Sequence, residues 1–218
     1  MYGAFVAELV RETASEVFVA DYRLAPEFPF PAGLGDAAMV LKELVRTRTS
    51  ASRLFIAGDS GGGGLAAGLM CAAAAERIPH IGGLILFSPE VDLRLDKPSI
   101  TENANLDILP WNIPTTSYLQ GADPGAGCVS AINQNVERWP PTFVAFGHDE
   151  IFRDAIRLLA DRLATAGVDT VAIEEQGMFH AFPILMPWAA ASRRVYHAVG
   201  EFVRRRVADV DRSTAAAS

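Results

Sequence analysis

The sequence predicts an α/β fold in which a mainly parallel sheet is flanked by helices on both faces. Five short runs read as strands, at residues 16–22, 53–57, 83–88, 142–146 and 170–174. These runs are mostly continuous in apolar residues rather than alternating, which is typical of parallel strands covered on both sides. Helical stretches separate them, and strands that alternate with helices indicate a parallel sheet.

The helices are predicted from apolar residues that recur about every 3.6 positions. Such a stripe runs through 36–48 and through 153–166, where Gly167 follows as a C-terminal glycine. Residues 65–75 form an apolar helix, and a last helix is expected over 188–207. Three consecutive arginines, Arg204 to Arg206, favour the negative C-terminal end of that last helix.

The length of 218 residues fits one domain. We expect this domain to span 1–208 and the polar segment 209–218 to be a disordered tail. Residues 92–141 are long, polar and proline-punctuated for a connection between strands. Such a segment predicts a pocket-lining excursion rather than a plain loop.

The composition of the chain indicates which partners, cellular location and cofactors to expect. Nineteen basic against 26 acidic residues give a net charge of −7, so a nucleic acid is not an expected partner. No apolar run reaches the length of a membrane span, and the first residues lack the features of a signal peptide, which predicts a cytoplasmic protein. Cys71 and Cys128 form no metal or redox spacing, so we expect reduced thiols, no metal and no cofactor.

The chemistry begins at Gly58-Asp59-Ser60-Gly61-Gly62, which matches G-x-S-x-G between a strand and a helix. In that context the serine occupies a sharp turn and projects its hydroxyl into a site. Chymotrypsin-like proteases carry the same letters, but they need a histidine before the serine, and none precedes Ser60 here. Two alternatives remain on this motif alone, a merely tight turn and a nucleotide-binding turn over 62–67 with Glu90 as its acid.

An acid and a histidine follow in the order that a nucleophilic serine requires. Asp149 comes directly after the strand at 142–146, and His180 follows the strand at 170–174. Parallel strands end at one edge of the sheet, so we expect Ser60, Asp149 and His180 to meet there. His180 would take the proton of Ser60, with a pKa near the ordinary 6.5, and Asp149 would orient it. Glu150 and Asp154 are the fallback acids.

Together these stretches resemble the hormone-sensitive-lipase-like branch of the α/β-hydrolases, which includes bacterial carboxylesterases. The resemblance rests on DYRLAPE at 21–27, GDSGGG at 58–63, Ser88-Pro89 before Val91-Asp92-Leu93, GHDEIFRD at 147–154 and GMFHAF at 177–182. It implies an α/β-hydrolase sheet and hydrolysis of short- to medium-chain carboxylic esters through an acyl-enzyme. Asp59, Trp111, Phe182 and Leu185 are the side chains expected to line the substrate pocket.

The chain departs from that family at its beginning. Members carry a His-Gly-Gly-Gly loop that supplies most of the oxyanion hole, and no His-Gly-Gly occurs in this sequence. The backbone N–H of Gly61 is then the one oxyanion donor to expect. In the family's sheet the strand before that loop lies between those matching 16–22 and 53–57, so we expect N-terminal strands to be missing and a gap about one strand wide.

Two hypotheses follow from an intact triad beside an absent loop. The first is a serine carboxylesterase whose sequence starts late or is a fragment, acting on a small-molecule ester. The second is a catalytically impaired or non-catalytic remnant of the same fold. The resemblance also makes a homodimer one assembly to test, because the family often dimerises through its last strand and helix.

Overall fold

Four parallel strands form the centre of the molecule, in the order β1-β2-β3-β4 across the sheet. The computed structural model describes residues 2–47, 50–76, 81–110 and 112–216. The strands are β1 (Phe55–Asp59), β2 (Gly83–Phe87), β3 (Thr142–Gly147) and β4 (Thr170–Glu175). Four of the five expected strands are therefore confirmed, with ends within two residues of the predicted ones.

The register of the strands sends alternate side chains to opposite faces. Leu86 of β2 pairs with Gly58 of β1 and with Val144 of β3. Leu86 and Val144 belong to one buried cluster, whereas their neighbours Phe87 and Ala145 belong to another. All residues of β2 and β3 are buried, as expected for strands covered on both faces.

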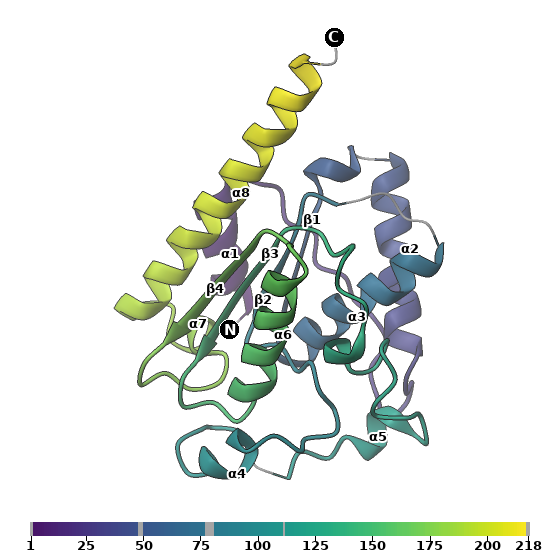
Figure 1. Ribbon diagram of the computed structural model, residues 1–218, viewed down its shortest axis with the longest axis vertical. Coiled ribbons are helices and arrows are strands. Elements are labelled where there is room, and N and C mark those ends of the chain that lie inside the picture. Colours follow the sequence, from purple (N-terminus) through teal and green to yellow (C-terminus); the bar gives the residue numbers. More distant parts are fainter. Residues whose placement is uncertain (1, 48–49, 77–80, 111, 217–218) are drawn as a thin grey trace.

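Helices cover both faces of this sheet (Figure 1). One buried cluster joins the sheet to α2, α3 and α6, and the other joins it to α1, α7 and α8. The helical elements are α1 (Tyr2–Thr13), α2 (Ala32–Thr47), η1 (Ala51–Arg53), α3 (Ser60–Glu76), α4 (Ser99–Glu102), α5 (Thr116–Leu119), η2 (Ala131–Asn133), α6 (Arg153–Thr165), α7 (Phe182–Leu185) and α8 (Ala190–Ala216).

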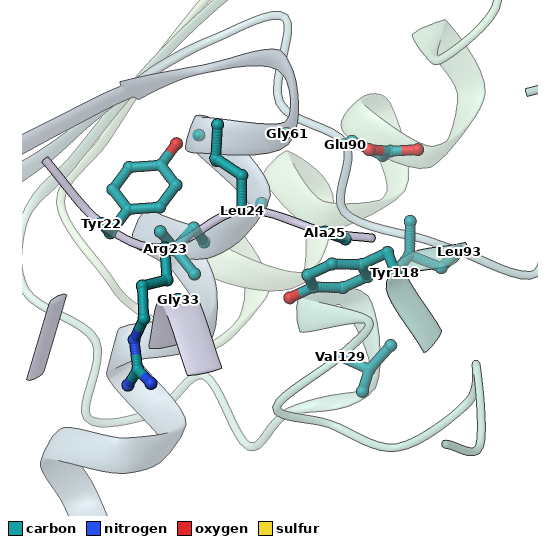
Figure 2. Close-up of a pocket in the computed structure, with 13 residues that line it drawn as sticks. Tyr22, Arg23, Leu24, Ala25, Gly33, Gly61, Glu90, Leu93, Tyr118 and Val129 are labelled. Atoms are coloured by element: carbon teal, nitrogen blue, oxygen red, sulfur yellow. The ribbon is translucent and has the colours of Figure 1, made fainter. Parts of the chain in front are cut away.

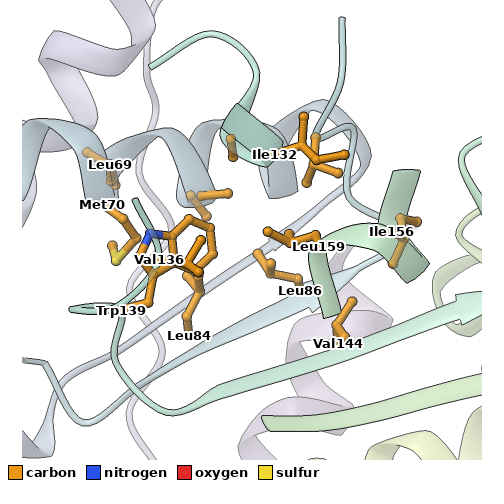
Figure 3. Packing of buried hydrophobic residues seen from close by; sticks show 14 of the residues in the cluster. Leu69, Met70, Leu84, Leu86, Ile132, Val136, Trp139, Val144, Ile156 and Leu159 are labelled. Carbon is orange, nitrogen blue, oxygen red and sulfur yellow. The ribbon is translucent and has the colours of Figure 1, made fainter. Parts of the chain in front are cut away.

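The segment 92–141 contributes to the first of these cores as well as to the surface. Its residues Ile132, Val136 and Trp139 are buried against Leu84 of β2 and Met70 of α3 (Figure 3). In its described residues the segment carries only short helices, α4, α5 and η2, and it packs back onto the sheet. It is thus anchored by apolar burial at its C-terminal end.

The expected strand at 16–22 is wrong, because this segment has no regular secondary structure and pairs with no strand among the described residues. Phe18 and Val19 are 64% and 69% exposed. On the facing side, β1 is an edge strand whose Ala57 is exposed. A strand needs a hydrogen-bonding neighbour, which the apolar composition of the segment alone cannot supply.

The expectation of reduced thiols is also wrong, because Cys71 and Cys128 form a disulfide. Their Cα atoms lie 5.3 Å apart although 57 positions separate them in the sequence. Gly68, one helical turn before Cys71, allows this approach, since a Cβ there would lie 2.9 Å from the carbonyl oxygen of Cys128. Sequence spacing alone cannot report such proximity between a helix and a distant loop.

The expected disordered tail at 209–218 is helical up to Ala216, the last described residue. The last helix, α8, continues through it without a break, and local contacts support the extension. Asp209 accepts hydrogen bonds from Arg206 and Arg212, and Arg53 of η1 pairs with Asp211. Charged pairs three positions apart stabilise an exposed helix end that has little to bury.

No helix in the described ranges has the length and apolar character to cross a membrane.

Candidate active site

Ser60 stands at a sharp turn between β1 and α3. Its φ of +52° is a left-handed conformation that non-glycine residues rarely adopt. Two glycines make the turn sterically feasible. A Cβ at Gly58 would lie 2.3 Å from the carbonyl oxygen of Gly62, and one at Gly64 would lie 2.4 Å from that of Glu90. The strand and helix can meet this closely only without those side chains, which explains the glycine-rich sequence around Ser60.

His180 lies in the loop after β4, and its imidazole reaches the serine. Its Nε2 is 2.8 Å from Ser60 Oγ, within hydrogen-bond distance. The backbone of the loop is tied down on both sides, because His180 N–H donates to Asp107 and Ala181 N–H donates to Ser88 Oγ. The predicted meeting of Ser60 and His180 at one edge of the sheet is therefore present in the structure.

The acid beside His180 is Glu150 rather than Asp149. Glu150 is buried, and its Oε1 lies 4.0 Å from His180 Nδ1. Its Oε2 accepts hydrogen bonds from Ser88 Oγ at 2.6 Å and from Gly147 N–H at 2.9 Å. Asp149 donates its backbone N–H to Met178, and its carboxylate has no hydrogen bond or ion pair among the described residues. The third candidate, Asp154, accepts a hydrogen bond from Ser99 N–H and binds Arg153.

Burial shifts the pKa values of the two facing groups in opposite directions. Desolvation raises the pKa of the Glu150 carboxyl and lowers that of the His180 imidazole below the expected 6.5, so both neutral forms are favoured. Glu150 Oε1 and His180 Nδ1 are both buried without a hydrogen-bond partner in the described part of the chain. A movement of about 1 Å would bring them within hydrogen-bond distance and satisfy both atoms.

A cavity of about 200 Å³ opens beside the serine turn (Figure 2). It is bounded by the backbone of Gly61 at the start of α3, by Tyr22 and by Glu90. Leu93, Tyr118 and Val129 of the segment 92–141 also line the cavity.

None of the expected pocket residues lines this cavity among those the structure describes. Phe182 is fully buried in the core under α7 and α8, and Leu185 lies half-buried on α7. The carboxylate of Asp59 accepts a hydrogen bond from Tyr2 of α1. Trp111 lies outside the described residues. Their expected role in lining a substrate pocket stays a prediction, because the strand ends, which the sequence located, do not fix where the loops between them fold.

Two further residues support the site without having been expected from the sequence. Ser88, directly after β2, connects Glu150 Oε2 to the backbone of the histidine loop. Asp107, in the segment 92–141, accepts hydrogen bonds from the backbone N–H groups of His180 and Ile151. Ser88 is part of the Ser-Pro pair noted above and could have been found by its place after a strand. Nothing in the sequence around Asp107 signals its role.

Comparisons with known proteins identify the family to which this fold belongs. A family model described as the alpha/beta hydrolase fold matches residues 1–184. The chain is 29% identical over 192 residues to an acetyl-hydrolase of Streptomyces hygroscopicus, covering 86% of this chain and 64% of that protein. It is 30% identical over 190 residues to the carboxylesterase NlhH of Mycobacterium tuberculosis, covering 80% and 59%.

Solved structures show the same likeness. A crystal structure of EstE5 soaked with p-nitrophenyl butyrate superposes with a TM-score of 0.88 at 30% identity, covering 93% of this chain and 70% of that one. An esterase from the bacterial hormone-sensitive lipase family gives a TM-score of 0.90 at 28% identity, covering 94% and 71%. The chain thus spans about 60–70% of the length of these relatives.

Proposed function

Because the chain belongs to the α/β-hydrolase family, we propose that it is a serine hydrolase that cleaves carboxylic esters through an acyl-enzyme. The observation that carries the proposal is the 2.8 Å contact between His180 Nε2 and Ser60 Oγ at a strained turn. The relatives named acetyl-hydrolase and carboxylesterase support the ester as substrate class. A cavity of about 200 Å³ is smaller than the usual ligand pocket of roughly 300–1,000 Å³, which favours short- to medium-chain acyl groups.

In the proposed reaction, Ser60 Oγ attacks the ester carbonyl while His180 Nε2 accepts the hydroxyl proton. The tetrahedral intermediate collapses, the C–O bond to the alcohol breaks, and His180 returns the proton to the departing alcohol. Water then attacks the acyl-serine with His180 again as base. The carboxylic acid leaves and Ser60 regains its hydrogen. No oxidant, metal or cofactor enters this sequence of steps.

We assign the orienting acid of this reaction to Glu150 in place of Asp149. An acid that stabilises the imidazolium must face Nδ1, and the 4.0 Å separation of Glu150 Oε1 from that atom supports the assignment. Two hydrogen bonds to Oε2 fix the carboxyl group of Glu150, while Oε1 stays available to face His180 Nδ1.

The proposed site has few hydrogen-bond donors to stabilise the oxyanion of the tetrahedral intermediate. The backbone N–H of Gly61 is the donor we assign, because this residue follows the nucleophile at the start of α3. Family members use a second group of donors from a His-Gly-Gly-Gly loop, and this sequence contains no such loop. Removing one oxyanion donor costs about 10²–10³ in rate, so we expect slow turnover from this chain alone.

A catalytically impaired or non-catalytic remnant is the second candidate function. The observation that favours it is the open edge of the sheet, where Ala57 of β1 is exposed beside the unpaired segment 16–22. Hydrolysis of p-nitrophenyl acetate, butyrate and octanoate by the wild-type chain and by Ser60→Ala separates the two. Turnover that falls to the background rate in Ser60→Ala supports the enzyme. Equal rates in both proteins support the remnant.

Location and assembly are further parts of the proposal. The disulfide between Cys71 and Cys128 is at odds with the expected cytoplasmic location, because disulfides persist mainly in oxidising compartments. Trapping free thiols with a maleimide reagent at cell lysis tests the location, and two free thiols per chain would support a reducing compartment. Light scattering of the purified protein tests whether it forms a homodimer.

A further inference from the structure

Glu90 places a carboxylate in the cavity next to the nucleophile. Its backbone N–H donates to the carbonyl oxygen of Ser60 at 3.0 Å, which fixes Glu90 against the serine turn. Its Oε2 lies 3.7 Å from the position that a Cβ on Gly61 would occupy. Glu90 is therefore in direct backbone contact with the proposed reacting serine, and it lies on the wall of the cavity that Figure 2 shows.

This carboxylate has no partner of its own in the described part of the chain. Glu90 Oε1 is buried and makes no hydrogen bond there. The cation that lines the same cavity, Arg23, is already engaged. Its Nε and one terminal nitrogen donate to the two carboxylate oxygens of Asp36 at 2.8 and 2.7 Å. An unpaired buried carboxylate is costly, so proteins normally give it a partner.

The remaining walls suit a positively charged group. Tyr22 and Tyr118 present aromatic rings to the cavity, and Leu93 and Val129 add apolar surface. Aromatic faces attract ammonium groups, and a nearby carboxylate adds direct charge complementarity. A neutral or anionic group in the cavity would leave the negative charge of the Glu90 carboxylate without a partner.

We propose that this cavity binds an ammonium group carried by the ester substrate and that Glu90 is the specificity-determining residue for it. The inference rests on the proposed ester hydrolysis, because it names the substrate class of the same site. Burial raises the pKa of Glu90 to about 7, and a bound cation would lower it again by stabilising the ionised carboxylate.

Matched esters that differ only in charge test the proposal. On the alcohol side the pair is butyrylcholine and its neutral carbon analogue, 3,3-dimethylbutyl butyrate. On the acyl side the pair is ethyl 4-aminobutyrate and ethyl pentanoate. At about pH 8, where Glu90 is ionised and these amines stay charged, we expect kcat/KM to favour the charged member of at least one pair by about tenfold or more.

The variants Glu90→Gln and Glu201→Gln locate the source of that preference. Glu90→Gln keeps the shape and removes the charge, so the charged-to-neutral ratio should fall to about one. Glu201→Gln removes an exposed charge from α8 and should keep the wild-type ratio. A wild-type ratio near one for both pairs, or a ratio that Glu90→Gln leaves unchanged, would overturn the proposal. Thermal melting of each variant checks that it is folded.

A binding measurement separates this proposal from the proposed catalysis. Calorimetric titration with 3-methylbutylammonium should give binding that 3-methylbutan-1-ol lacks and that Glu90→Gln abolishes. Binding without any esterase turnover would keep the ammonium site and refute the proposed function. Turnover of neutral esters without ammonium binding would refute the site and keep the function.

Discussion

Ser60 and His180 follow the carboxyl ends of β1 and β4, the two outermost strands of the four-stranded sheet. Their order in the sequence and their places after strands were sufficient to predict that they meet. The acid could not be chosen in the same way, because Asp149 and Glu150 are adjacent in a turn after β3. Which of the two side chains turns inward depends on contacts with Ser88 and Gly147 that no local pattern reports.

The choice of acid gives a direct prediction. Glu150→Gln should lower kcat by about 10³–10⁴-fold, because a neutral amide cannot stabilise the imidazolium of His180. Asp149→Asn is the matched control and should stay within about twofold of wild type. Steady-state kinetics with p-nitrophenyl butyrate measures both. The reverse pattern, with Asp149→Asn inactive, would restore the acid predicted from the sequence.

The pH dependence of hydrolysis reports the environment of His180. Burial lowers the pKa of its imidazole, and the neutral imidazole is the form that accepts a proton. The active form therefore persists to lower pH than for an exposed histidine. We expect the acid limb of kcat/KM to have its midpoint below 6.5, measured from about pH 4 to about pH 8. A midpoint at or above 6.5 would contradict the lowered pKa of His180.

At the scale of elements, the packing of α3 against the loop after β2 depends on particular glycines. A Cβ at Gly64 would lie 2.4 Å from the carbonyl oxygen of Glu90, whereas one at Gly61 would meet its nearest atom at an ordinary 3.7 Å. Gly64→Ala should therefore lower the unfolding free energy by about 1–3 kcal/mol or more, as overpacked sites do. Gly61→Ala should change it by less than about 1 kcal/mol. Chemical denaturation measures both, and equal effects would contradict the described helix position.

The disulfide ties α3 to the segment that carries Val129 of the cavity wall. A cross-link that closes 57 positions of chain stabilises the folded state by up to about 4 kcal/mol through the unfolded state. Replacing both cysteines by serine should therefore lower the melting temperature strongly. Thermal melting of the oxidised wild type against the double variant measures the difference. An unchanged melting temperature would show that the link is not formed in solution.

At the scale of the whole molecule, sequence patterns predicted the strands and the main helices but not strand pairing or the cavity. The four strands were predictable from their apolar runs, which are continuous in β2 and β3 because both faces of these strands are buried. The helices α2, α3, α6 and α8 were predictable from their apolar residues. The segment at 16–22 carries a similar signature but lies unpaired, because pairing depends on a neighbour outside the segment itself. The cavity was not predictable either, because its walls come from segments far apart in the sequence, such as those that carry Tyr22 and Tyr118.

The central claim is that Ser60 is an activated nucleophile in this chain. Labelling with a fluorophosphonate, which reacts covalently with such serines, tests it even where turnover is slow. We expect the folded wild-type protein to take one label on the peptide containing Ser60, and Ser60→Ala to take none, as read by mass spectrometry. Folded wild-type protein that remains unlabelled, or a label that persists in Ser60→Ala, would contradict the claim.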